Sequence, residues 1–293
     1  MKSTLIQMMI RFGGNPRCLA EVIGEPSTKV SRTILELQNQ YNLTLFPAVY
    51  SEGLGLRKYL LTIKGAHIKY ETASKLFHPI MNLFRGDIQD QLFSIILFAD
   101  EKVMKEVDNV LKKISGSNFF ISQIKRTRKF VRDPQCYDFE SKRWKCEDRE
   151  ELKQGSTLDG PDENDIKGVA TIQVNPFFDL RLIPHRHHVL KVITGFMYTL
   201  GNLDFIVQVI SKDDLSEEFP DVLWTAEGED IFVSEMHVDR IRLESVLKKL
   251  KNRSMEIILS TKSPLYALGY SIPYEIFRKG MWTYPKIEVT VKK

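Results

Sequence analysis

The sequence predicts an α+β protein, in which an N-terminal unit of three helices and a hairpin precedes one or two small α/β modules. Helical periodicity dominates the first forty residues, strands and helices then alternate, and a glycine-led strand pattern occurs twice. The chain has 293 residues, of which 43% are hydrophobic. That length and composition are sufficient for two or three domains with buried cores.

Residues 3–42 are expected to form three short helices. The second begins near Pro16, because proline suits the first turn of a helix, and it ends at Gly24. Apolar residues at helical spacing mark the buried faces. In the first helix these are Leu5, Met8, Met9 and Phe12, and in the third they are Val30, Ile34, Leu37 and Tyr41. The outward face of the third helix is then polar and basic.

Two apolar stretches follow the helices and are expected to pair as a hairpin. They span Leu43–Tyr50 and Leu56–Ile63, with a glycine-bearing turn at residues 51–55 between them. Three helices followed by a hairpin are the element order of a winged helix-turn-helix. The segment Pro16–Leu37 also resembles a helix-turn-helix, with Leu19-Ala20 at the close approach of two helices.

In this arrangement the third helix enters the major groove of double-stranded DNA and its N-terminal half meets the base edges. The predicted base readers on the outward face are Thr28, Lys29, Arg32 and Thr33, with Ser31 beside them. The predicted phosphate contacts are Arg17, Ser27 and, in the wing, Arg57 and Lys58.

The residues Leu37–Tyr50 and Gly55–Ile63 resemble the leucine-responsive regulator (Lrp/AsnC) family of transcription regulators. The resemblance implies a winged helix-turn-helix followed by a ferredoxin-like βαββαβ sensor module. It also implies a homodimer that binds double-stranded DNA and a small-molecule effector. Gly86–Ile96 and Gly201–Val209 are similar to each other, which suggests that the sensor module is duplicated.

On this basis the chain divides into four segments: a DNA-binding domain at 1–66, a ferredoxin-like domain at 67–132, an acidic linker or long loop at 133–168 and a second α+β domain at 169–293. Within the first module, helices are expected at Tyr70–Phe77 and Glu101–Ile114, and strands at Gln91–Phe98 and Phe119–Thr127. In the second half, alternation resumes at Val169–Val174. The later elements are a helix at His187–Val192, strands at Phe205–Ile210 and Ile231–Met236, and a helix at Arg240–Leu250.

A basic run from Lys125 to Arg132 leaves the last strand of the first module. Its side chains could contact phosphate, or they could protect a strand edge and dock against the acidic segment that follows. The overall charge does not distinguish between these two interpretations, because the net charge is only +4.

Three cysteines, Cys18, Cys136 and Cys146, favour a reducing cytoplasm over a secreted disulfide scaffold. We expect no membrane span, because no apolar run approaches about 18 residues. No nucleophile elbow and no phosphate-binding glycine loop is present. The sequence therefore predicts a protein that is not an enzyme, with no catalytic residues and no cofactor.

The histidine-rich stretch His185–His188 leaves two further hypotheses open. With Cys136 and Cys146 it could hold zinc, but the two cysteines are ten residues apart, and we expect no metal. Related architectures also occur in haem-pathway decarboxylases, where histidines and arginines hold a tetrapyrrole.

A further alternative, which does not involve the histidines, is an adaptor that uses its winged helix to bind another protein.

Overall fold

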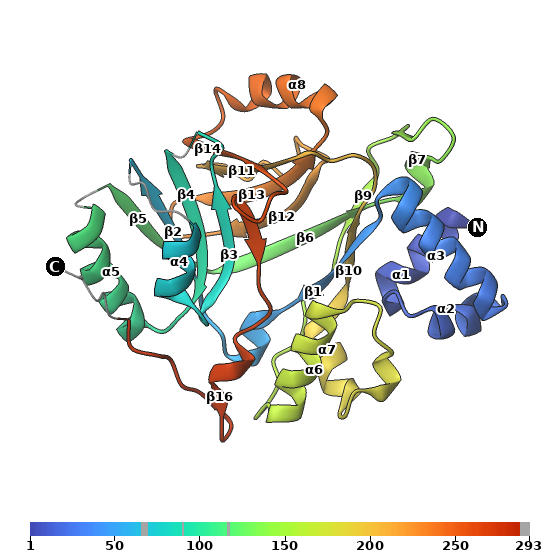
Figure 1. Cartoon of the computed structure of the whole chain (residues 1–293), viewed down its shortest axis with the longest axis horizontal. Helices are drawn as coiled ribbons and strands as arrows, with labels where there is room; N and C mark the ends of the chain where they lie inside the picture. The colour runs from blue at the N-terminus through green and yellow to red at the C-terminus, as the bar shows by residue number, and fades with distance from the viewer. Residues whose placement is uncertain (66–69, 90, 116–117, 288–293) are drawn as a thin grey trace.

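A computed structural model describes residues 1–65, 70–89, 91–115 and 118–287 of the chain (Figure 1). It has a mixed α+β architecture with several antiparallel sheets. Within the described ranges no helix is both long enough and apolar enough to cross a membrane.

The three predicted N-terminal helices are present as α1 (Lys2–Phe12), α2 (Pro16–Ile23) and α3 (Ser27–Tyr41). The Asn15 side chain caps α2 by accepting hydrogen bonds from the backbone of the first turn. Gly24, at a φ of 74°, ends α2 in the left-handed conformation that glycine adopts without strain. These helices share a hydrophobic core with α6 (Glu163–Val174), α7 (Arg186–Val192) and β10 (Ile193–Thr199).

The predicted wing hairpin is wrong. β1 (Thr44–Val49) pairs antiparallel with β10, whereas β2 (Lys58–Lys64) lies between two strands of a different sheet. A short 3-10 helix, η1 (Ser51–Leu54), separates β1 and β2. Six of the seven residues of β2 are buried, so β2 is a central strand that is covered on both faces rather than one arm of an exposed wing.

β2 opens the first α/β unit, which continues through α4 (Tyr70–Phe77), β3 (Met81–Gly86), β4 (Leu92–Phe98), α5 (Glu101–Ser115) and β5 (Phe119–Ile124). The sheet order β3-β4-β2-β5 with antiparallel pairing is that of a ferredoxin-like βαββαβ module. Helices α4 and α5 cover the outer face of this sheet.

The second unit has the same strand order, β14-β11-β13-β12. It comprises β11 (Phe205–Ser211), β12 (Val222–Glu227), β13 (Phe232–Val238), α8 (Arg240–Leu250) and β14 (Glu256–Thr261), and turns at 212–221 stand where the first helix would be. The topology is therefore duplicated, but the strands that correspond in the two units are not the ones that the sequence similarity aligned. The glycine-led segments precede β4 and β11, which are the third strand of one unit and the first strand of the other.

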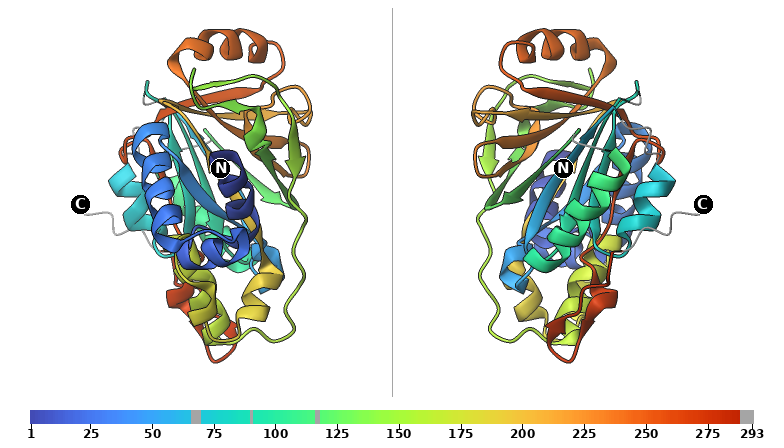
Figure 2. Two further views of the ribbon diagram at one scale, coloured as in Figure 1. Left: turned by 90° about the vertical axis from the view of Figure 1, so that its right-hand side faces the viewer. Right: turned by 90° about the vertical axis from the view of Figure 1, so that its left-hand side faces the viewer.

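Each unit contributes a strand to the sheet of the other. β6 (Arg126–Arg132) pairs with β12, and β15 (Ala267–Gly269) pairs with β3. The inner faces of the two sheets meet in a separate apolar cluster that includes Leu60, Ile96 and Val233. The two units are therefore joined face to face within one chain (Figure 2).

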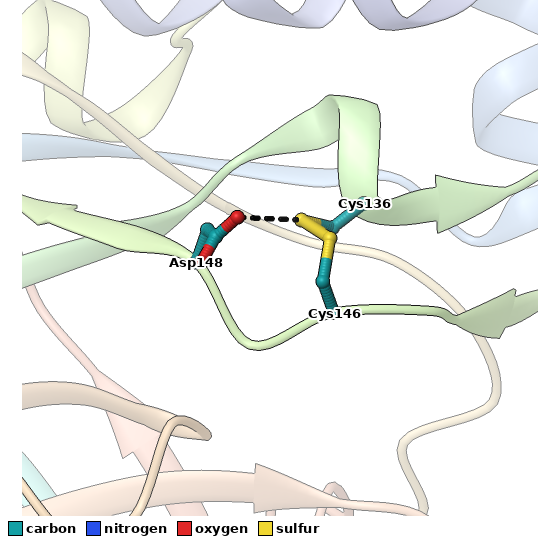
Figure 3. Close-up of side chains that lie close together, drawn as sticks. All are labelled: Cys136, Cys146 and Asp148. Atoms are coloured by element: carbon teal, nitrogen blue, oxygen red, sulfur yellow. Dashed lines mark hydrogen bonds between the residues drawn. A yellow bond between two sulfur atoms is a disulfide. The ribbon is translucent and has the colours of Figure 1, made fainter.

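Residues 133–168 contain more ordered structure than the predicted linker. After the 3-10 turn η2 (Pro134–Cys136) come β7 (Tyr137–Asp138), β8 (Arg143–Trp144) and β9 (Arg149–Glu151), and α6 begins at Glu163. Cys136 and Cys146 form a disulfide, and the carboxylate of Asp148 lies 3.8 Å from the sulfur of Cys136 (Figure 3). Val169–Val174, where strand alternation was expected to resume, is the C-terminal half of α6.

The remaining elements are short. η3 (Leu180–Leu182) precedes α7, and η4 (Tyr274–Ile276) is followed by the hairpin of β16 (Phe277–Arg278) and β17 (Met281–Trp282). The Trp282 indole donates a hydrogen bond to the Leu54 carbonyl, which fixes the C-terminal hairpin against η1.

Candidate functional site

Two of the predicted DNA contacts are buried. Thr33 is 4% exposed, and its hydroxyl donates a hydrogen bond to the Lys29 carbonyl. Lys58 is 7% exposed, and its ammonium lies 3.4 Å from the Glu52 carboxylate. The prediction that Thr33 reads bases and that Lys58 contacts phosphate is therefore wrong, because neither side chain reaches the surface.

The other predicted contacts divide between two places. On α2 and α3, Arg17, Ser27, Thr28, Lys29 and Arg32 are exposed and Ser31 is half-buried. The Lys29 ammonium is paired with the Glu25 carboxylate at 2.7 Å. Arg57 precedes β2, away from any wing, and its guanidinium pairs with Glu101 at the start of α5. Only the α2 and α3 residues remain together as a candidate surface.

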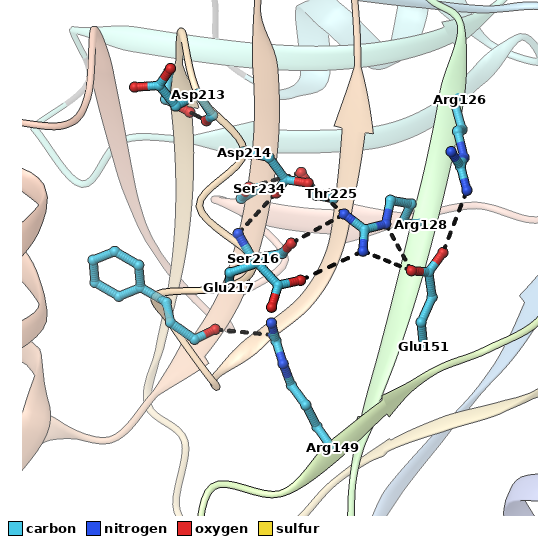
Figure 4. A network of polar contacts seen from close by, with 12 residues as sticks. Arg126, Arg128, Arg149, Glu151, Asp213, Asp214, Ser216, Glu217, Thr225 and Ser234 are labelled. Carbon is cyan, nitrogen blue, oxygen red and sulfur yellow. Dashed lines mark hydrogen bonds and ion pairs between the residues drawn. The ribbon is translucent and has the colours of Figure 1, made fainter.

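The basic run around β6 docks inside the chain. The Arg128 guanidinium contacts the carboxylates of Glu151 and Asp214, each at 2.7 Å (Figure 4). Glu151 belongs to β9, which pairs with β6, so the acidic segment that follows the basic run covers it. The intramolecular alternative for this run is confirmed.

A cavity of about 730 Å³ lies between the two sheets. Much of its wall is apolar, including Phe46, Phe98, Met197 and Trp224. Its basic and acidic lining residues are Lys58, Arg85, Lys129, Glu235, His237 and Lys262. A volume of this size is typical of sites for cofactors and other drug-sized ligands.

Arg85 and Glu235 form a buried ion pair across the two units. The Arg85 guanidinium donates from Nε and Nη2 to the two carboxylate oxygens of Glu235, at 2.8 and 2.9 Å. Burial favours the neutral acid, but the charge of Arg85 and the hydrogen bonds from His237 and Arg85 outweigh it and lower the pKa of Glu235 to about 2. The pair therefore stays charged at neutral pH and holds β3 against β13.

Lys129 on β6 has an unusual environment. Lys129 lines the cavity, and its ammonium donates a hydrogen bond to the Val49 carbonyl at 2.8 Å. Burial and, to a smaller extent, the charge of Lys58 lower the pKa of Lys129 to about 7. Near neutral pH this amine is therefore able both to give and to take a proton.

His237 on β13 also lines the cavity. Burial lowers its pKa, so the neutral imidazole is favoured, and its Nε2 lies 3.5 Å from Oε1 of Glu235. Among the described residues, neither its buried Nδ1 nor the buried Oγ1 of Thr127, another lining residue, has a hydrogen-bond partner. Unpaired buried polar atoms are costly, so their presence in a cavity wall indicates a site for a polar ligand.

No protein-family model matches the chain, and no curated protein is similar to it in sequence. Two solved structures resemble its architecture. The first is the siroheme decarboxylase NirDL, with 14% identity over 91% of this chain and 94% of that chain and a TM-score of 0.46. The second is the same enzyme in complex with an iron-uroporphyrin III analogue, with 14% identity over 94% of each chain and a TM-score of 0.49.

The expectation of a protein without catalytic activity is contradicted by this finding, because both similar structures are those of an enzyme. The Lrp/AsnC resemblance is supported only as a mixed α+β architecture with antiparallel sheets. Neither structure supports the DNA-binding part of the prediction.

The sequence reasoning did not identify the cavity residues as a site. Glu235 and His237 alternate with apolar residues at the end of β13, which was the one signal available before the fold was known. The histidines that drew attention, His185–His188, are not among the cavity-lining residues. Cys136 and Cys146 are joined to each other, so they cannot serve as the thiolate ligands of the zinc hypothesis.

Proposed function

We propose that the chain is an enzyme that binds a tetrapyrrole with several carboxylate side chains in the cavity between the sheets and removes carbon dioxide from it. The observation that carries the proposal is the cavity itself, which combines apolar walls with amines and an unpaired histidine nitrogen. The apolar walls suit a flat macrocycle, and the amines suit its carboxylates. This substrate class is the one named for the similar structures.

The amines that can receive a carboxylate are Lys129 and Lys262. Arg85 and Lys58 already have carboxylate partners, in Glu235 and Glu52. Burial lowers the pKa of Lys262 as well as that of Lys129. Nearby carboxylates compensate the charges of both buried amines only poorly. An anionic ligand beside them is therefore attracted more strongly than it would be at an exposed lysine.

Decarboxylation requires a proton donor at the reacting carbon. When the carbon–carbon bond to the carboxylate breaks, carbon dioxide leaves and the electron pair stays on the carbon, which must then take a proton. In our proposal Lys129 gives that proton, because a pKa of about 7 makes its ammonium a stronger acid than that of an ordinary lysine. The Thr127 hydroxyl holds the carboxylate by donating a hydrogen bond, and Nδ1 of the neutral His237 imidazole accepts a hydrogen bond from a protonated group of the ligand.

The test is incubation of the purified protein with an iron-uroporphyrin III-type substrate, followed by mass spectrometry for loss of carbon dioxide. Lys129→Met is expected to slow the reaction by roughly 100-fold or more, the usual effect of losing a positioned acid. Lys125→Met is the matched control, because Lys125 directly precedes β6 and is exposed. No loss of carbon dioxide, or equal rates for the two variants, would contradict the proposal.

Binding of duplex DNA is a second candidate function, and it rests on the exposed N-terminal half of α3. The double variant Lys29→Ala/Arg32→Ala is expected to weaken duplex binding and to reduce the slope of log affinity against log salt by about 0.9 for each phosphate that the variant no longer neutralises. A filter-binding or anisotropy titration at several salt concentrations measures this. An unchanged affinity and slope would remove α3 as a DNA-binding surface.

A further inference from the structure

We infer that Asp165, His185 and His188 form a binding site for a divalent transition-metal ion such as Zn²⁺. Asp165 lies in the first turn of α6, and the two histidines lie at the start of α7. The cavity is lined by Gln173 at the other end of α6, eight residues from Asp165, or about 12 Å along the helix. The inference therefore does not depend on the proposed decarboxylase function.

The local sequence fixes the carboxylate of Asp165. Asp162 caps α6 through its Oδ1, which accepts hydrogen bonds from the backbone of Asn164 and Asp165. In return, Oδ2 of Asp165 accepts a hydrogen bond from the backbone N–H of Asp162. This capping box orients the side chain and leaves Oδ1 of Asp165 directed at the histidines. Asp165 itself is only 1% exposed.

The two histidines present the same ring nitrogen to this carboxylate. His185 has a φ of 51° as the N-cap of α7, a strained conformation for a residue other than glycine. His188 follows three residues later, on the first turn. As a result, Nδ1 of both imidazoles lies near one oxygen of Asp165.

The distances match those of a metal centre. Oδ1 of Asp165 lies 3.1 Å from Nδ1 of His188 and 3.8 Å from Nδ1 of His185, and one ligand atom from each residue lies within 4.8 Å of the other two. Tetrahedral zinc with bonds of about 2.0–2.1 Å separates its ligand atoms by about 3.3 Å. Shifts of side-chain torsions at the two half-exposed histidines are sufficient to reach that geometry.

A fourth ligand is also at hand. Oδ2 of Asp162 is not used by the capping hydrogen bonds and lies 3.2 Å from Nδ1 of His185. The side chains of His185 and His188 are 47% and 37% exposed, so an ion can enter from solvent and can keep a water molecule. The two imidazole ligands favour a transition metal such as zinc or nickel over magnesium or calcium.

The experiment titrates the full-length chain with Co²⁺ and Zn²⁺ in a Cys18→Ser background, because Cys18 is the one cysteine outside the disulfide. Isothermal calorimetry gives the stoichiometry, and the visible bands of Co²⁺ report its coordination geometry. We expect one ion per chain and tetrahedral cobalt bands that are displaced by Zn²⁺.

Variants separate this site from non-specific binding. His185→Gln and Asp165→Asn are each expected to weaken binding at least about tenfold; asparagine keeps an oxygen for the capping hydrogen bond, so folding is preserved. His187→Gln is the matched control, because His187 is exposed and adjacent to His188 but is not one of the three ligands. Absence of one-to-one binding, or an equal loss in His187→Gln, would overturn the inference and leave ordinary histidine–aspartate hydrogen bonds.

Discussion

Glu235→Ala is expected to lower the free energy of unfolding by about 3–5 kcal/mol, because it leaves the Arg85 guanidinium buried without its counter-ion. Arg85 and Glu235 are only 6% and 3% exposed, so little of either side chain is in contact with bulk solvent. The remaining hydrogen bonds of Arg85, to the carbonyls of Phe84 and Leu268, are neutral and compensate only part of the charge. Urea denaturation of the variant and the wild type measures the difference.

Two controls separate the buried charge from a loss of packing. The double variant Arg85→Leu/Glu235→Leu removes both charges and is expected to be more stable than Glu235→Ala. Glu101→Ala breaks the exposed pair with Arg57 and is expected to change stability by less than about 1 kcal/mol. If the double variant were the least stable of the three, the pair would not be acting through its charges.

The second large effect concerns the pH dependence of stability. Because the pKa of Lys129 falls from 10.5 to about 7 on folding, the unfolded chain binds the extra proton between these values. The contribution of Lys129 to the free energy of unfolding therefore increases as the pH rises from about 7 to about 10.5. Below pH 7 the folded protein bears the full cost of burying the ammonium.

Lys129→Met removes this penalty. At pH 6.5 the variant is expected to gain stability relative to the wild type, and the gain should shrink by about 2–4 kcal/mol as the pH rises to 10. Thermal or urea unfolding across this pH range provides the measurement, with the exposed Lys125→Met as a control that should show no such trend. A difference between wild type and Lys129→Met that is independent of pH would show that the amine is well solvated.

Local structure was predictable to a large extent. The helices that became α1, α3, α5 and α8 carry apolar residues at helical spacing, which is a property of the segment itself. Pairing between strands was not predictable, because an apolar stretch such as Leu43–Tyr50 looks the same whichever strand it pairs with. Its partner, β10, lies almost 150 residues further along the chain. We expected a hairpin with the next apolar stretch because that stretch is the nearest in sequence, and this expectation was wrong.

The candidate sites depend on that long-range pairing. Arg85 and Glu235 are 150 residues apart in sequence and meet only because the two α/β units lie face to face. Lys129 was seen as part of a basic run, but its cavity-facing position follows from the exchange of β6 into the second sheet. Asp165 stood in a segment expected to be a loop, so nothing in the sequence linked it to His185 and His188.

Direct binding of a tetracarboxylate porphyrin tests the central claim, that the cavity between the sheets takes a polycarboxylate macrocycle. The measurement is a titration followed by absorbance, with the tetramethyl ester of the same porphyrin as the uncharged comparison. The cavity model predicts binding of one porphyrin per chain, at least about tenfold weaker for the ester and for Lys129→Met, with Lys125→Met unchanged. Equal binding of the acid and the ester, or of the wild type and Lys129→Met, would contradict it.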